Sequence, residues 1–252
     1  DSRLSRGLGD VYKRQEQGYT SSHIVRTLKK KFNIKKIGHY GTLDPLASGV
    51  LPLALGEATK TIQFITFTQK SYSFFINWGK ETDTCDKAGK VLRETNARPN
   101  IAEIKPTIKK YFTGDIDQTP PIFSAVKVNG KRAYQLARKN EKFEINSKRI
   151  SINKFELLRS INKNKAQFIV SCGPGTYVRS LARDLSRKLG TLGYTSGIVR
   201  LKNSYFCISS SIRFKKIINC NTSNFYKKLL PVEYVLKNFK EIKLEKKYSD
   251  ML

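Results

Sequence analysis

The chain is 252 residues long, enough for one large domain or for one domain with a small appendage. Its 48 lysines and arginines against 20 acidic residues give a formal net charge of +28. That excess favours a polyanionic partner, most simply nucleic acid, although a genome composition rich in lysine codons would also produce it. No run approaches the roughly 18 apolar residues of a membrane span, and the first residues lack the apolar segment of a secretion signal. The four cysteines have no Cys-x-x-Cys spacing and there are two histidines, so neither a zinc site nor a disulfide framework is indicated.

The N-terminal stretch DSRLSRGLGDVYKRQ is polar and aperiodic, so we expect residues 1–15 to be disordered or foreign to the fold. The following TSSHIVRTLKKKFNIKK predicts a helix that is capped by Thr20 or Ser21. Its apolar stripe consists of Ile24, Leu28 and Phe32. This helix is ordinary core material, with its lysines on the opposite face.

The stretch GHYGTLDPLASGVLPLALGEATK has a single acidic residue, Asp44, before Glu57. Two interpretations are open at this point. Asp44 followed by Pro45 is a common way to begin a helix, with the aspartate as N-cap. Alternatively, an isolated carboxylate in a glycine-rich, apolar loop is a nucleophile or a general base.

Further along the chain, Tyr72, Phe74, Ile76 and Trp78 alternate in KSYSFFINWG, which predicts a strand that ends at Gly79. A helix is expected around 102–112, and Asn129-Gly130 predicts a hairpin turn. The segment KAQFIVSCGPGTYVRSLARDLSRKLG predicts a strand, a glycine turn and a helix that stops at Gly190. Strands and helices do not alternate regularly, which favours an α+β fold.

The sequence contains no phosphate-binding Gly-x4-Gly-Lys-Ser/Thr loop, no dinucleotide fingerprint and no Gly-x-Ser-x-Gly nucleophile turn. A carboxylate, an arginine and aromatic residues remain, and this set suits attack at a sugar or a base. Arg179 lies in the first turn of its predicted helix, where a positive charge opposes the helix dipole. Pairing with a carboxylate would account for it, and Asp44 is the candidate.

Four stretches carry a resemblance to a known family: GHYGTLDPLASGVLPLALGEATK, KSYSFFINWGKETDTCDKAGKV, QTPPIFSAVKVNGKRAYQLAR and GTYVRSLARDLSRKLG. In this order they resemble the bacterial TruB-type tRNA pseudouridine synthases, from about Gly18 to Pro231. The resemblance implies isomerisation of uridine-55 in the TΨC loop of tRNA, with no cofactor or metal. It also implies a cytoplasmic, monomeric enzyme that binds the tRNA T-arm and requires no protein partner.

The resemblance implies roles for individual residues. Asp44 matches the catalytic aspartate, Tyr72 the tyrosine that stacks on the flipped target base, and Arg179 the arginine that pairs with the aspartate. His39 matches a residue that helps to bind and flip the RNA loop, and Leu201 resembles an apolar residue that lines the pocket. Three basic residues complete the expected substrate-binding set: Lys60, Lys127 and Arg132.

The implied architecture is the pseudouridine synthase fold, a mixed, largely antiparallel central sheet flanked by helices. We expect a catalytic domain over 16–208, a thumb-like insertion at about 115–150, and a small PUA-like C-terminal module over 209–252. The family's opening strand and Lys-Pro pair are not recognisable, and VYKRQEQGYTSS stands in their place. Two other functions stay open, a guide-RNA-dependent pseudouridine synthase and a non-catalytic RNA chaperone of the same fold.

Overall fold

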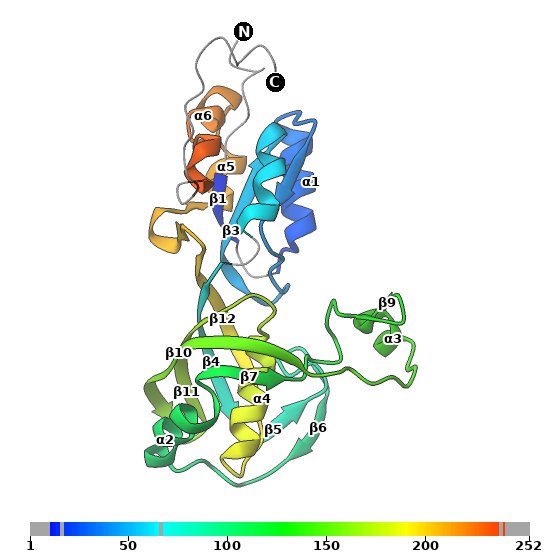
Figure 1. Cartoon of the computed structure of the whole chain (residues 1–252), viewed down its shortest axis with the longest axis vertical. Helices are drawn as coiled ribbons and strands as arrows, with labels where there is room; N and C mark the ends of the chain where they lie inside the picture. The colour runs from blue at the N-terminus through cyan, green and yellow to red at the C-terminus, as the bar shows by residue number, and fades with distance from the viewer. Residues whose placement is uncertain (1–10, 16–17, 66–67, 237–238, 240–252) are drawn as a thin grey trace.

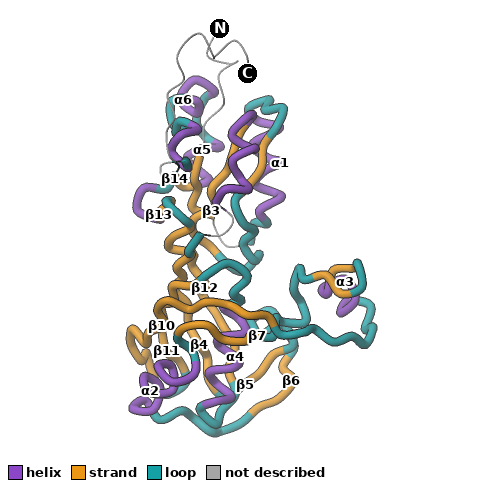
Figure 2. The backbone as a smooth tube through the Cα atoms, in the orientation of Figure 1, coloured by secondary structure: helices purple, strands orange, loops and turns teal. Residues whose placement is uncertain are grey.

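The computed structural model describes residues 18–65, 68–236 and 239, together with the backbone of Val11–Gln15. The molecule is elongated, and the long strands β3, β4 and β12 run through its centre (Figures 1 and 2). Within the described residues, no helix is both long enough and apolar enough to cross a membrane. The strands are β1 Val11–Gln15, β2 Ile37–His39, β3 Ser48–Leu55, β4 Lys70–Trp78, β5 Lys80–Thr82, β6 Val91–Glu94, β7 Gly114–Gln118, β8 Lys127–Val128, β9 Lys131–Arg132, β10 Lys148–Asn162, β11 Lys165–Cys172, β12 Gly193–Asn203, β13 Phe206–Cys207 and β14 Ile212–Arg213. The helices are α1 Ser21–Lys31, α2 Ile101–Tyr111, α3 Ala133–Arg138, α4 Val178–Lys188, α5 Phe214–Ile218 and α6 Thr222–Tyr226, with 3-10 turns η1 Gly56–Ile65, η2 Ile208–Ser210 and η3 Val232–Val235.

One large sheet organises these elements, in the order β14-β1-β3-β12-β4-β11-β10-β7. The pairs β12–β3 and β1–β14 are parallel, and the other neighbours along this order are antiparallel. Helices pack beside the sheet, α4 and α2 at one end of the molecule and α1, α5 and α6 at the other (Figure 1). The expected α+β architecture with a mixed, largely antiparallel sheet is therefore confirmed.

Elements with a clear local pattern form where the sequence predicts them. The helix α1 is capped by Thr20, whose side chain accepts a hydrogen bond from His23 N, and it buries Ile24 and Leu28. The strand β4 buries Phe74, Ile76 and Trp78, as their alternation requires. Asn129 and Gly130 both have positive φ and join β8 to β9, as expected for a two-residue hairpin turn.

The backbone of Val11–Gln15 forms a strand, so our expectation that residues 1–15 stay outside the fold is wrong for these five residues. The strand β1 lies between β3 and β14, and its pairing with β3 runs from Val11↔Leu53 to Gln15↔Gly49. Strand pairing uses backbone groups, so it requires no apolar periodicity in the strand itself. Residues 1–10 lie outside the described part of the chain.

An arm formed by residues 119–147 leaves the sheet after β7 and returns at β10 (Figure 1). The two strands that flank it are paired through Lys148↔Gln118, so the arm begins and ends at neighbouring points. It carries β8, β9 and α3 away from the rest of the molecule. Its bounds are close to those of the expected thumb-like insertion.

Of the C-terminal segment 209–252, the structure describes β14, α5, α6 and η3. Phe225 of α6 stacks on Phe32 beside α1, with 3.9 Å between the ring centroids, so this segment shares the core of the chain. Its assignment as a PUA-like module stays a prediction.

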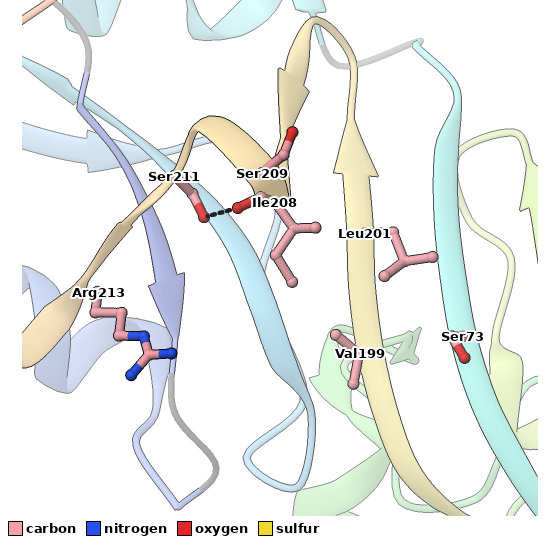
Figure 3. A pocket seen from close by; sticks show the side chains of 7 residues that line it. All are labelled: Ser73, Val199, Leu201, Ile208, Ser209, Ser211 and Arg213. Atoms are coloured by element: carbon pink, nitrogen blue, oxygen red, sulfur yellow. Dashed lines mark hydrogen bonds between the residues drawn. The ribbon is translucent and has the colours of Figure 1, made fainter.

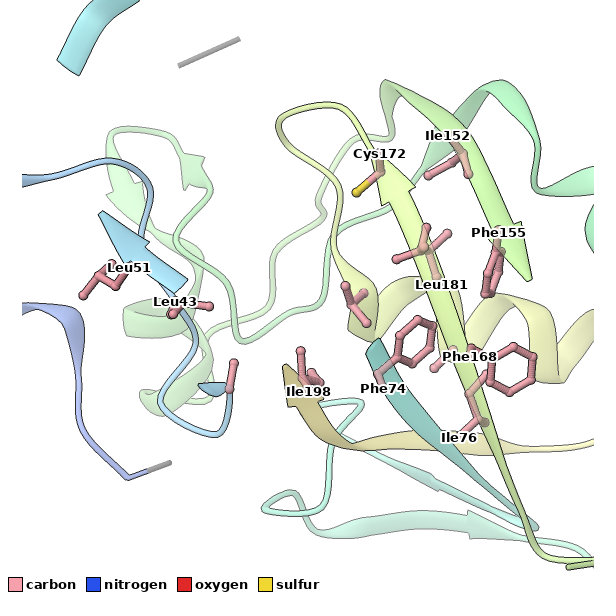
Figure 4. Close-up of a cluster of buried hydrophobic side chains, with 14 of the residues drawn as sticks. Leu43, Leu51, Phe74, Ile76, Ile152, Phe155, Phe168, Cys172, Leu181 and Ile198 are labelled. Carbon is pink, nitrogen blue, oxygen red and sulfur yellow. The ribbon is translucent and has the colours of Figure 1, made fainter. Parts of the chain in front are cut away.

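The main core lies between the sheet and its helices and is continuous along the molecule. Around α4 and β10 it contains Phe74, Phe155, Phe168 and Leu181 (Figure 4). Burial of side chains of this size contributes about 1.5–3 kcal/mol each, which is enough to hold the helices against the sheet. The same core includes Leu43, one residue before Asp44, so the loop that carries the carboxylate is anchored in it.

We predict that Gly49→Ala destabilises the protein by about 3 kcal/mol. Gly49 has φ +110°, and an added Cβ would lie 2.7 Å from Arg200 N and closer still to the Arg200 carbonyl oxygen. Denaturant unfolding measures the loss. The matched control is Gly190→Ala, where φ is +71° but nothing lies within 4 Å, so the loss there is about 1 kcal/mol. Equal losses would contradict the close approach of β3 and β12.

Candidate active site

Asp44 lies in a turn that joins β2 to β3, not at the start of a helix. The N–H of Ala47 donates to the Asp44 carbonyl oxygen at 2.9 Å, which closes the turn. The N–H of Leu43 donates to the buried Ser21 hydroxyl at 3.0 Å, and this bond ties the loop to the start of α1. The helix-cap interpretation of Asp44 is therefore wrong, and its carboxylate is available for another role.

Arg179 meets this carboxylate from the first turn of α4. Its Nε lies 2.9 Å from Asp44 Oδ2, and the arginine side chain is 6% exposed whereas that of Asp44 is 40% exposed. The expected pairing is therefore present, although the Nε–H does not point at the oxygen and the contact is an ion pair without hydrogen-bond geometry. The contact is made through Nε alone, because the terminal nitrogens have other partners.

Those partners come from two further segments. Arg179 Nη1 donates to Thr84 O at 3.0 Å and lies 3.6 Å from Asp86 Oδ2. Arg179 Nη2 donates to Phe123 O at 3.2 Å, at the base of the arm. One guanidinium thus connects the Asp44 loop, the turn after β5 and the arm.

Asp86 is the more enclosed of the two carboxylates, with a side chain that is 10% exposed. Its Oδ1 accepts hydrogen bonds from Thr84 Oγ1 at 2.6 Å and from Ala88 N at 3.0 Å. Asp44 differs, since its Oδ1 contacts no hydrogen-bond donor among the described residues. Asp86 is thus engaged by protein groups, whereas Asp44 presents one held oxygen and one open oxygen, the arrangement that suits a nucleophile or a base.

Tyr72 of β4 and Arg200 of β12 are direct cross-strand neighbours beside Asp44. Burial raises the pKa of the Tyr72 phenol, and Arg200 opposes this shift while the Asp44 carboxylate adds to it. Burial lowers the pKa of the Arg200 guanidinium, and Tyr72 and Asp44 oppose that change. The charges of all three residues therefore act on one another, and the stacking role that the resemblance implies for Tyr72 stays a prediction.

Tyr177, directly before α4, adds a second phenol on which the Asp44 charge acts. Burial raises the pKa of Tyr177, and the Asp44 charge raises it further. Its backbone is fixed by Gln118, whose Oε1 accepts from Tyr177 N at 2.8 Å and whose Nε2 donates to Tyr177 O at 3.2 Å. The end of β7 thereby sets the position of the helix that carries Arg179.

His39 lies at the end of β2, half-buried, on the way into the Asp44 loop. Burial lowers the pKa of His39, and the positive charge of Arg200 lowers it further. Its Nδ1 is buried without a hydrogen-bond partner. Burial therefore favours the neutral imidazole, and His39 forms no hydrogen bond or ion pair with Asp44 among the described residues.

Leu201 does not join this group of residues. A bulge at Gly197, which has φ +58°, shifts the register of β12 against β4 between Ser196 and Val199. After the bulge, Ile198 and Arg200 face Tyr72, and Leu201 faces the opposite side of the sheet. There it lines a separate pocket, with Ser73, Val199, Ile208, Ser209, Ser211 and Arg213 (Figure 3).

The three expected basic contacts are exposed, and none of them forms a hydrogen bond or ion pair with Asp44 within the described part of the chain. Lys60 lies in η1 and forms a surface ion pair with Glu57. Lys127 and Arg132 are paired across the hairpin of the arm, and Arg132 Nη1 donates to Ala125 O. The charge of Arg132 opposes, as a minor contribution, the rise that burial causes in the pKa of Tyr177.

Sequence reasoning missed Asp86, Arg200, Tyr177 and Gln118. These residues have no local pattern that separates them from surface polar residues, because tertiary contacts alone bring them to Asp44. Among the described residues, no three His, Cys, Asp or Glu side chains gather as ligands of a metal ion.

The family model described as TruB family pseudouridylate synthase (N terminal domain) matches residues 29–178. The chain belongs to this family. It is 42% identical over 227 residues to tRNA pseudouridine synthase B of Ehrlichia ruminantium, which covers 89% of this chain and 76% of the relative. Identity to the proteins of the same name from Wolbachia pipientis and Bartonella henselae is 43% and 44%, with 86% and 80% of this chain covered. The chain spans 61% and 63% of the length of these two relatives.

Solved structures agree on the fold of this TruB-family chain. A Cbf5-Nop10-Gar1 complex contains a chain that matches with a TM-score of 0.70 at 25% identity, over 94% of this chain and 64% of that one. An H/ACA RNP bound to a substrate RNA containing 2′-deoxyuridine matches with the same TM-score at 22% identity, over 94% of this chain and 63% of that one. The pseudouridine synthase fold expected from the sequence is thereby confirmed.

We predict that the protein loses stability between pH 7 and pH 5 partly through His39. Its folded-state pKa is lowered, so the unfolded chain binds this proton more readily and stability falls as pH falls below the ordinary value of about 6.5. Thermal melts across this range should show a smaller loss for His39→Gln than for the unmodified chain. His23→Gln, at the exposed histidine of α1, is the control. Parallel curves for all three proteins would contradict the prediction.

Proposed function

We propose that this chain isomerises uridine-55 in the TΨC loop of tRNA to pseudouridine, with Asp44 as the group that attacks the nucleotide. The observation that carries the proposal is the contact between Asp44 and the buried Arg179, in a chain that belongs to the TruB family. The relatives' shared name, tRNA pseudouridine synthase B, supports tRNA as the substrate. The proposal goes beyond the relatives' name in three points: the modified nucleotide is uridine-55, Asp44 takes part in the chemistry, and the target base is flipped out of the RNA stack.

The reaction breaks the N1–C1′ bond of the nucleotide and forms a C5–C1′ bond. The electron pair of the broken bond leaves with the uracil, which turns so that C5 faces C1′. After the new bond forms, C5 loses its proton and N1 gains one, so the reaction is redox-neutral. A carboxylate at the anomeric carbon suits this chemistry, as it does in retaining glycosidases.

Two routes for Asp44 fit the open Oδ1. In the first, the carboxylate attacks C1′ and forms a covalent sugar ester that C5 later displaces. In the second, it removes the C2′ proton as the uracil leaves C1′, which gives a glycal; C5 of the turned base then adds to C1′ while C2′ takes the proton back from Asp44. Arg179 holds the other carboxylate oxygen in both routes and so orients the reactive one.

The target base must leave the RNA stack before Asp44 can reach its sugar, at a cost of a few kcal/mol. Tyr72, beside the carboxylate, would offset part of this cost, since stacking of a base on an aromatic ring contributes about 1–3 kcal/mol. The basic arm would hold phosphates of the T-arm without reading sequence. The monomeric state, the independence from protein partners and the cytoplasmic location stay predictions.

The central test uses a T-arm stem-loop RNA with tritium at C5 of uridine-55. Release of tritium to water without guide RNA is the expected result, because C5 loses its proton. A transcript with cytidine at this position is the control. Activity that requires a guide RNA would support the guide-dependent alternative, and binding without release would support the chaperone alternative.

Asp44→Asn should abolish tritium release while the Kd for the stem-loop stays within about threefold, because the amide keeps the shape of the side chain but loses its nucleophilicity. Rapid-quench assays with enzyme in excess measure the chemical step, and filter binding measures the Kd. Turnover close to that of the unmodified chain would remove Asp44 from the chemistry.

The double variant Lys127→Gln/Arg132→Gln should bind the stem-loop more weakly and with less dependence on salt. Each phosphate contact contributes about 0.7–0.9 to the slope of log affinity against log salt, so the slope should decrease by about 1.5. Lys105→Gln/Lys109→Gln, on α2 away from the arm, is the matched control (Figure 1). Identical slopes for the two double variants would show that the arm does not contact phosphates.

A further inference from the structure

Arg200 is 1% exposed and donates hydrogen bonds to the backbone on both sides of Asp44. Its Nη2 donates to Gly41 O at 3.1 Å and its Nη1 to Thr42 O at 3.4 Å, before the carboxylate. Its Nε donates to Val50 O at 2.7 Å, after the carboxylate. A single side chain thus bridges the two ends of the Asp44 loop.

The strand β12 brings the guanidinium to this place. Arg200 pairs with Gly49 of β3 on one side and with Tyr72 of β4 on the other. Because Gly49 has no side chain, the two backbones approach closely enough for the arginine to reach the Val50 carbonyl oxygen. Next along the same strand, Asn203 Nδ2 donates to Tyr40 O at 2.6 Å, directly before the loop.

Burial of a guanidinium is costly unless its donors are satisfied and its charge is balanced. Arg200 has no carboxylate within ion-pair distance among the described residues, and neutral carbonyl oxygens accept its hydrogen bonds. An apolar side chain in this core position would avoid the cost. The buried charge therefore needs a functional explanation. The Asp44 carboxylate, in the loop that Arg200 holds, provides one.

We propose that Arg200 is a positioning residue for the reaction, which fixes both ends of the Asp44 loop so that the carboxylate meets the sugar in one orientation. The inference rests on the proposed function, and it assigns Arg200 no contact with substrate. The planar fork of arginine donates in three directions at fixed angles, whereas a lysine ammonium cannot reach the three carbonyl groups together. A displacement of about 1 Å in a reacting group costs about 10²-fold in rate.

The experiment compares Arg200→Lys with the unmodified chain in three measurements. We expect the single-turnover rate on the stem-loop to fall about 100-fold and the Kd to stay within about threefold. We expect hydrogen exchange of backbone amides in 41–50 to become at least about tenfold faster in the RNA-free protein. Gly190→Ala is the control for lost stability, since it strains the backbone after the end of α4, where φ is +71°, and should leave the loop unchanged.

The outcomes separate this inference from the proposed function. A wild-type rate for Arg200→Lys on an active chain would overturn the positioning role. A slow rate with unchanged exchange of 41–50 would also overturn it, because the effect would not act through the loop. If the unmodified chain releases no tritium, the proposed function fails, and faster loop exchange in Arg200→Lys would still support Arg200 as the anchor of the loop.

A second variant covers the case in which Arg200→Lys does not fold. Ser21→Ala removes the hydroxyl that accepts the Leu43 N–H and so loosens the centre of the same loop. It should change the three measurements in the same direction as Arg200→Lys but by less: the single-turnover rate falls, the Kd is unchanged, and amide exchange in 41–50 becomes faster. An unchanged rate despite faster exchange would show that fixing this loop does not matter for the chemistry, and the proposal would fall.

Discussion

The site depends on the burial of the Arg179 guanidinium at the point where three chain segments meet. A buried cation is stable only if carboxylates and carbonyl oxygens surround it, and these come from the Asp44 loop, the turn at Thr84 and Asp86, and the base of the arm. Removal of any one segment would take away a carboxylate or a carbonyl oxygen that balances the guanidinium. The arginine therefore couples the geometry of the Asp44 carboxylate to the integrity of the surrounding fold.

The helix α4 connects Arg179 to a second ion pair, which also involves the hairpin that begins with β5. Two turns beyond Arg179, Arg187 donates to both oxygens of the buried Glu81 at 2.8 and 2.7 Å. Glu81 belongs to β5, and the turn after β5 supplies Asp86. The helix thus holds the same hairpin at two points, which fixes Asp86 against Arg179 more firmly than either contact alone.

Local patterns in the sequence predicted the helices and strands, whereas tertiary contacts determine which side chains form the site. The helix at Ser21–Lys31 and the strand at Lys70–Trp78 follow from periodicity, which depends on neighbours along the chain. Asp44-Pro45 looked like a helix cap because nothing local distinguishes that cap from a turn closed by Ala47. Leu201 lies on the opposite face of β12 from Arg200, and the register shifts of β12 against β4 that set this face depend on strand pairing, which no local pattern shows. The isolated carboxylate and the first-turn arginine pointed to Asp44 and Arg179, and the resemblance added Tyr72, whereas only tertiary contacts bring Arg200 and Asp86 to the site.

The charges around the site have different roles because they differ in exposure. Two guanidiniums, Arg179 and Arg200, lie close to two carboxylates, Asp44 and Asp86, so the group is balanced as a whole. Arg200 and Asp86 are enclosed and bonded to protein groups, and they form a fixed electrostatic frame. Asp44 alone is substantially exposed, at 40%, so substrate can approach one carboxylate while the other three charges stay in place. In the proposed reaction, preorganised charges of this kind would not need to rearrange as the bond to the base breaks, and a rigid fold would lower the barrier in this way.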